Sequence, residues 1–158
     1  MTSAELAAAL EDGSLDLAAV PPAEFARIVR DVPQREAAVF MAGPHRGRVL
    51  DELFRRMAVL LRPEAVGDRE VLLRWRITAP GGGHDTFETA IAGGVLTVTA
   101  HRTERAPRLT LTMAAPELLR LAAGLASGPA LFLTRRLSAR GDLLVAAALT
   151  RWFDLPRG

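Results

Sequence analysis

Apolar residues recur with helical spacing in the first part of the chain. Between positions 45 and 61 they return every three or four residues, so they share one face of a helix while charged residues occupy the other. This stripe consists of Val49, Leu50, Leu53, Phe54, Met57, Leu60 and Leu61. Three weaker patterns before it predict short helices over Ser3–Leu10, Ala23–Arg30 and Gln34–Met41. The first of these is marked by the capping-box spacing of Thr2 and Glu5.

From residue 71 onward the period of the apolar residues changes to two, which is typical of strands with one buried face. The alternating segments are 71–78, 86–91, 96–99 and 108–113. Short connections between them predict an antiparallel meander, with one solvent-exposed face and the opposite face covered by helices. Arg74 and Arg76 would then pair with Glu88 across strands on the exposed face.

The end of the chain, from Ser127 to Asp154, combines several short elements. The pattern predicts a turn or short helix at Pro129–Thr134, a strand at Arg136–Arg140 and a helix at Leu143–Phe153. Before this stretch, it predicts a helix at Pro116–Ala123. Gly141 ends the strand, and the Asp142 carboxylate can cap the first free N–H groups of the last helix. The apolar face of that helix carries Val145, Leu149, Trp152 and Phe153.

This last stretch resembles the C-terminal signature of the sterol carrier protein 2 (SCP-2) domain, through Gly141-Asp142, the apolar helix and the Trp152-Phe153 ending. Matching pieces occur earlier in the family's order, at Trp75-Arg76-Ile77, Pro107–Met113, Pro116–Gly124 and Ser127–Thr134. The resemblance covers roughly residues 48 to 153 and is to the bacterial single-domain type. Arg135-Arg136 departs from it, since family members often carry Gly-Lys at this position.

The resemblance implies an α+β fold, with a five-stranded, mostly antiparallel sheet and helices packed on one face. We expect residues 45–158 to form this SCP-2-like lipid-binding domain. Residues 1–44 are expected to be an N-terminal helical cover segment, because so short and loosely amphipathic a segment buries too little to fold alone.

Composition narrows the classes of function. The chain of 158 residues is 49 % hydrophobic and has a net charge of +2, and all of its basic residues are arginines. It shows no dense basic run with interleaved aromatic residues, so we expect no nucleic-acid partner. Cysteine is absent, the start of the chain is acidic and no apolar run reaches membrane-spanning length, and we therefore expect a cytoplasmic protein.

Residues with catalytic or metal-binding spacing are not evident. His45, His84 and His101 lie far apart in the sequence and lack the HxxxH or HExxH spacing of zinc ligands. The glycine run at 81–83 precedes a strand, so it indicates a hairpin turn and not a phosphate loop. We therefore expect no metal, no cofactor and no catalytic residues.

What remains is an excess of large apolar residues, which form either a plain core or a pocket. SCP-2-like domains hold a sterol, fatty acid or acyl-CoA in a hydrophobic tunnel between the sheet and the C-terminal helices, and the resemblance implies the same here. The lipid-binding residues that we expect are Leu73, Trp75, Phe87, Met113, Leu119, Leu125, Leu131, Phe132, Val145, Leu149, Trp152 and Phe153.

The first functional hypothesis is therefore non-catalytic binding or transfer of an apolar ligand, with at most transient contact with a membrane surface. A second is an enzyme of lipid, polyketide or terpenoid metabolism that uses the same cavity. A third is a structural or dimerisation module of the kind appended to a larger enzyme. Polar groups inside the tunnel would favour the enzyme, and a filled cavity would favour the structural module. The sequence leaves the ligand and the oligomeric state open, and we lean against catalysis.

Overall fold

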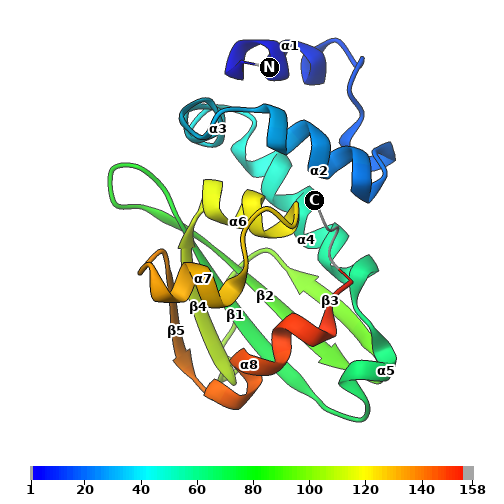
Figure 1. Ribbon diagram of the computed structural model, residues 1–158. Helices are drawn as coiled ribbons and strands as arrows, with labels where there is room; N and C mark the ends of the chain where they lie inside the picture. The colour runs from blue at the N-terminus through cyan, green and yellow to red at the C-terminus, as the bar shows by residue number, and fades with distance from the viewer. Residues whose placement is uncertain (1, 155–158) are drawn as a thin grey trace.

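The computed structural model describes residues 2–154, which form one five-stranded sheet with helices on one of its faces (Figure 1). The N-terminal elements are α1 (Ser3–Glu11), the 3-10 helix η1 (Leu17–Ala19), α2 (Pro22–Asp31), α3 (Gln34–Met41), α4 (Arg46–Leu60) and α5 (Pro63–Val66). The remaining elements are β1 (Val71–Thr78), β2 (His84–Ala92), β3 (Val95–Thr99), β4 (Leu109–Ala114), α6 (Ala115–Ala122), α7 (Gly128–Leu133), β5 (Leu137–Gly141) and α8 (Leu143–Trp152). The expected α+β class is confirmed. Within residues 2–154 no helix has both the length and the apolar character needed to cross a membrane.

The strands of the sheet follow the order β3-β2-β1-β4-β5. Three of the four pairings are antiparallel, as expected, but β4 lies parallel to β1, with Leu73 opposite Leu109 and Met113 opposite Ile77. The predicted meander is therefore wrong at this point. The connection over residues 100–108 does not form a hairpin but carries the chain across β2 and β1 to the far side of β1.

This crossover connection covers part of the sheet face opposite the helices, and it explains a second error of the sequence analysis. Arg74 and Glu88 do pair across β1 and β2, with 2.8 Å between Arg74 Nε and Glu88 Oε2, but their side chains are only 9 % and 2 % exposed. Thr103 of the connection donates its backbone N–H and its hydroxyl to Glu88, and its carbonyl accepts from Arg74. The pair is buried by the crossover and is not on a solvated face.

The helical face of the sheet is covered from two sides. Phe54 of α4 is fully buried and lies against β1 and β2, where its ring stacks on Phe87 at 4.3 Å and meets Trp75 edge-on at 5.7 Å. Helices α6 and α8 contact β4, and α7 contacts β5. The end of α8 is tied back to the end of α4, because Phe153 bridges to Leu61 and the Trp152 carbonyl accepts from the Arg62 N–H at 2.6 Å.

The start of α8 follows the local signals in the sequence. The Asp142 carboxylate accepts from the N–H groups of Leu144 and Val145, so the predicted N-cap is confirmed. Burial raises the pKa of Asp142, but these two hydrogen bonds and the Arg108 guanidinium outweigh it, and the net pKa is lowered. Gly141 has a φ of 122°, and a Cβ atom there would lie 2.4 Å from the Arg108 carbonyl oxygen, so only glycine fits this junction.

The first three helices form a further layer on α4 and α6, at the end of the molecule away from most of the sheet (Figure 1). The capping box of Thr2 and Glu5 is present at the start of α1. Leu6, Leu10, Phe25, Val29 and Phe40 belong to the same hydrophobic core as the inner residues of the sheet. The N-terminal layer therefore packs as part of one core, while the boundary that we place after residue 44 stays a prediction.

Candidate functional site

All but two of the predicted lipid-binding residues belong to the hydrophobic core or pack against it; the exceptions are Leu131 and Phe132, and Leu119 also lines a second space described below. The buried members are Leu73, Trp75, Phe87, Met113, Leu119, Leu131, Val145 and Trp152. Leu125, Leu149 and Phe153 are half-buried and pack against the same core. Phe132 is 52 % exposed, so it lies at the surface beside the buried Leu131. Whether these residues bind a lipid stays a prediction.

The inner face of the sheet forms one side of this interior. It is apolar apart from one hydrogen-bonded pair of side chains, Trp75 and Thr89. Leu73, Ile77 and Leu109 are fully buried on β1 and β4. Thr89 is also fully buried, and its hydroxyl accepts the indole N–H of Trp75 at 2.9 Å. Because this bond uses the one donor of the Trp75 indole, the side chain contributes an apolar surface to the interior.

Helix α4 forms a wall of the interior that the sequence analysis did not assign to the site. Trp75 and Phe87, which we expected to face the C-terminal helices, lie against Phe54 of α4. The signal was present, because Phe54 belongs to the predicted apolar stripe of residues 45–61. The spacing of the stripe shows that Phe54 is buried, but it does not show which part of the protein Phe54 contacts. Its contact with the aromatic residues of β1 and β2 depends on tertiary packing.

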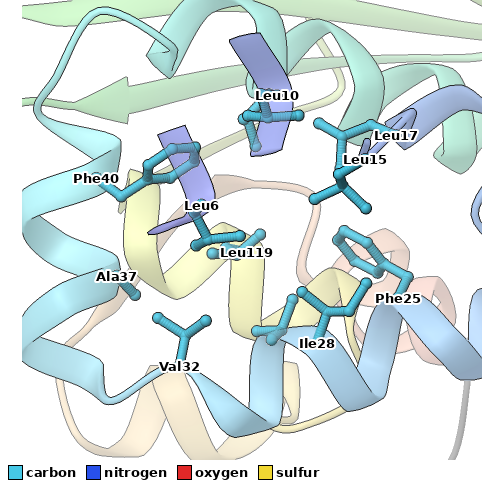
Figure 2. A pocket seen from close by; sticks show the side chains of 12 residues that line it. Leu6, Leu10, Leu15, Leu17, Phe25, Ile28, Val32, Ala37, Phe40 and Leu119 are labelled. Atoms are coloured by element: carbon cyan, nitrogen blue, oxygen red, sulfur yellow. The ribbon is translucent and has the colours of Figure 1, made fainter. Parts of the chain in front are cut away.

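A separate cavity of about 40 Å³ lies on the other side of the α4 and α6 layer, beneath the N-terminal helices (Figure 2). Its lining consists of Leu6, Leu10, Leu15, Leu17, Phe25, Ile28, Val29, Val32, Ala37, Phe40, Val49 and Leu119. Leu119 alone was among the predicted site residues.

The cavity is partly open to the surface. Leu15, Leu17 and Ile28 are the half-buried members of its lining, and Figure 2 shows them on the same side as Phe25. Sequence analysis missed this feature because the N-terminal helices were taken only as a cover. A possible signal was the pair of leucines, Leu15 and Leu17, between two predicted helices.

Two arginines of α4 hold this connection in place. Arg56 donates from Nη2 to the carbonyls of Leu17 and Val20 at 2.7 and 2.6 Å, and Arg55 donates to the Ala18 carbonyl at 3.4 Å. The Arg56 guanidinium is buried, lies 4.6 Å from the centre of the Phe25 ring and is 3.1 Å from Glu52. Burial lowers the pKa of Arg56, while the Glu52 carboxylate opposes that shift.

Titratable groups do not gather into a metal site in the part of the chain that the structure describes. No three His, Asp or Glu side chains within residues 2–154 are placed to share a metal ion. His45 stacks on Phe40 and is 3.1 Å from Glu11, and His84 begins β2. The contacts of His45 are therefore structural, and His84 is exposed at the start of its strand.

Comparison with known families identifies the domain. The alkyl sulfatase C-terminal family matches residues 46–158, which is more than half of the chain. The chain belongs to this family. Ten of the twelve residues that line the N-terminal cavity precede the matched range, and Val49 and Leu119 lie within it. A search of curated protein sequences gives no match.

Solved structures with similar folds include both alkylsulfatase and SCP-2 domains. The stereoselective inverting sec-alkylsulfatase Pisa1 from Pseudomonas sp. is 17 % identical with a TM-score of 0.56, over 68 % of this chain and 17 % of its own. The UbiJ-SCP2 ubiquinone synthesis protein is 14 % identical with a TM-score of 0.51, over 68 % and 95 %. The Aedes aegypti SCP-2, solved with the C16 fatty acid palmitate, is 19 % identical with a TM-score of 0.50, over 64 % and 90 %.

At these identities the similarity establishes the fold, and the expected SCP-2-like architecture is thereby confirmed. The family domain corresponds to a small part of a longer enzyme, because the chain spans 17 % of the length of the alkylsulfatase. The departure noted at Arg135-Arg136 also has a structural counterpart. Arg135 has a φ of 61°, and it is the one residue other than glycine with a positive φ in residues 2–154.

Proposed function

We propose that this domain binds an apolar ligand of the sterol, fatty acid or acyl-CoA class between its sheet and its C-terminal helices, without catalysis. The observation that carries the proposal is the apolar interior formed by the floor of β1, β2 and β4 and the walls of α4, α6 and α8. The Aedes aegypti SCP-2, which shares the fold, was solved with palmitate. The proposed contacts include Leu73, Met113, Val145, Leu149 and Trp152.

The energetics of such a site need no charged or catalytic group. Each CH₂ group of a ligand that leaves water contributes about 0.8 kcal/mol, so a long acyl chain can reach micromolar affinity after the cost of association. Leu73, Met113 and Val145 are between 0 % and 3 % exposed. Binding therefore requires the half-buried outer residues of this region, Leu125, Leu149 and Phe153, to move apart from the sheet.

The first test is native mass spectrometry of the protein as purified, in which a retained lipid adds a defined mass. The second is titration with a fluorescent fatty acid of the unmodified protein and of Leu149→Trp. Leu149 is half-buried on α8, so we expect the indole to occupy ligand space with near-neutral stability. We expect at least about tenfold weaker binding, a loss of about 1.4 kcal/mol.

The matched control is Leu144→Trp, because Leu144 lies on the same helix and is 80 % exposed. This control should bind the fatty acid like the unmodified protein. Destabilisation of Leu149→Trp by about 1–3 kcal/mol would indicate a filled core. That result, or no measurable binding by the unmodified protein, would contradict the proposal.

A second candidate function is favoured by the family match. A domain related to the C-terminal part of an alkyl sulfatase can serve as an accessory module of a larger enzyme, which was our third hypothesis. Failure of the fatty-acid titration would leave this structural role ahead. The expected cytoplasmic location and the transient membrane contact stay predictions.

A further inference from the structure

We infer that the cavity beneath the N-terminal helices is a second binding site, specific for small and wholly non-polar molecules. It is distinct from the proposed lipid site, because α4 and α6 lie between the two spaces. Val49 and Leu119 form the part of its lining that comes from these two helices. The remaining ten lining residues come from residues 6–40, before the range that matches the family.

The chemistry of the lining determines the class of ligand. All twelve side chains are Leu, Ile, Val, Ala or Phe, so none of them can donate or accept a hydrogen bond. A polar molecule would lose its hydrogen bonds to water on entering and would gain none. Cavities of this kind stay dry and take up xenon or benzene, since these molecules fill space without needing polar partners.

The size of the cavity limits the ligand further. A volume of about 40 Å³ is well below the roughly 300–1,000 Å³ of pockets that hold drug-sized ligands. A sterol or a whole fatty acid therefore does not fit. A single xenon atom requires the least rearrangement, and a flat ring such as benzene requires the mouth to widen.

The mouth of the cavity borders a connection that is restrained by hydrogen bonds. Its half-buried residues Leu15 and Leu17 belong to a connection that is fixed to α4 by the guanidinium groups of Arg55 and Arg56. Benzene can enter only if these hydrogen bonds lengthen or break, so we expect xenon to bind more tightly than benzene.

The experiment uses the full chain with ¹³C-labelled methyl groups, recorded by NMR under xenon pressure and in a benzene titration. We expect saturable shifts confined to the lining methyls, such as those of Leu6, Leu10 and Leu119. In Ala37→Leu the added side chain points into the cavity, and the apparent affinity for xenon should fall at least tenfold. Leu149→Trp, which blocks the proposed lipid site, should retain xenon binding unchanged.

Several outcomes would overturn the inference. They are the absence of any saturable shift at the lining methyls, equal xenon affinity in Ala37→Leu, or a loss of xenon binding in Leu149→Trp that matches the loss of fatty acid. Should Ala37→Leu fail to fold, Val32→Ile adds a single methylene to the same lining and should still weaken binding of benzene. If the unmodified protein binds xenon but no fatty acid, the proposed function is refuted and this inference stands.

Discussion

The buried Arg74–Glu88 pair should be the most sensitive polar contact of the sheet. Glu88 accepts from Arg74 Nε at 2.8 Å, from the Thr103 N–H at 3.2 Å and from the Thr103 hydroxyl. Arg74 uses Nη2 for the carbonyls of Thr103 and Arg105. In Glu88→Ala the guanidinium stays buried without its countercharge, and breaking a buried pair in this way costs about 3–5 kcal/mol.

The assay is urea unfolding followed by the fluorescence of Trp75 and Trp152, both of which are buried. The matched control is Glu104→Ala, an exposed glutamate of the same connection, which should change the unfolding free energy by less than about 0.5 kcal/mol. The double variant Arg74→Met with Glu88→Met removes both charges and should recover most of the loss. A cost below about 1 kcal/mol for Glu88→Ala, or a double variant as unstable as the single one, would refute the reasoning.

The same pair predicts a pH dependence. Burial raises the pKa of Glu88, but the Thr103 hydroxyl, the Arg74 guanidinium and the Thr103 N–H together outweigh it, so the pKa lies below its ordinary value of 4.5. The contribution of the carboxylate is therefore complete above about pH 4.5 and is lost as the pH falls through the lowered pKa. The stability difference between the unmodified protein and Glu88→Gln should shrink between pH 6 and pH 3, and a constant difference would contradict this.

Three further predictions concern the backbone and the N-terminal layer. Gly141→Ala should destabilise by at least about 3 kcal/mol in urea unfolding, because the added Cβ meets the Arg108 carbonyl, and Gly128→Ala, where a Cβ meets open space, is the control. Arg135→Gly should stabilise by about 1 kcal/mol, since it relieves a left-handed conformation, and unchanged stability would argue against strain there. A chain beginning at Pro44 should stay folded and bind an apolar dye more strongly, because Val49 and Leu119 lose their cover; complete unfolding by circular dichroism would show that the layer is essential.

Local signals accounted for most of the elements that the sequence predicted. The capping box at Thr2 and the Asp142 cap are each encoded within a few residues, and the structure has a helix beginning after each of them. The turn or helix expected over Pro129–Thr134 is the helix α7. Helix α7 ends in a motif that requires a left-handed residue, and Arg135 occupies that position. The Arg136 N–H donates to the Leu131 carbonyl at 2.8 Å, which is the hydrogen bond expected for such a helix end.

Non-local features could not be predicted in the same way. The alternation of β4 indicates a strand but not its partner, and the polar connection at 100–108 was the one indication that it does not form a hairpin. The burial of Glu88 followed from that crossover and was missed with it. Leu119 was predicted as a lipid-binding residue, and it belongs to the same core, but it also lines the N-terminal cavity. The spacing of apolar residues on a helix identifies its buried face but does not show which neighbouring layer that face contacts.

The parallel pairing of β1 and β4 has a consequence for how the chain folds. Strands β1, β2 and β3 are neighbours in sequence and are joined by short turns, so they can pair early in folding. The pairing of β1 with β4, which places Leu73 opposite Leu109, joins residues that are far apart in the sequence and therefore forms later. Until β4 arrives, β1 presents an open edge that carries Leu73, Trp75 and Ile77. Such an edge can pair with another chain, so weakening the crossover should lower the yield of soluble protein during refolding by more than its effect on equilibrium stability.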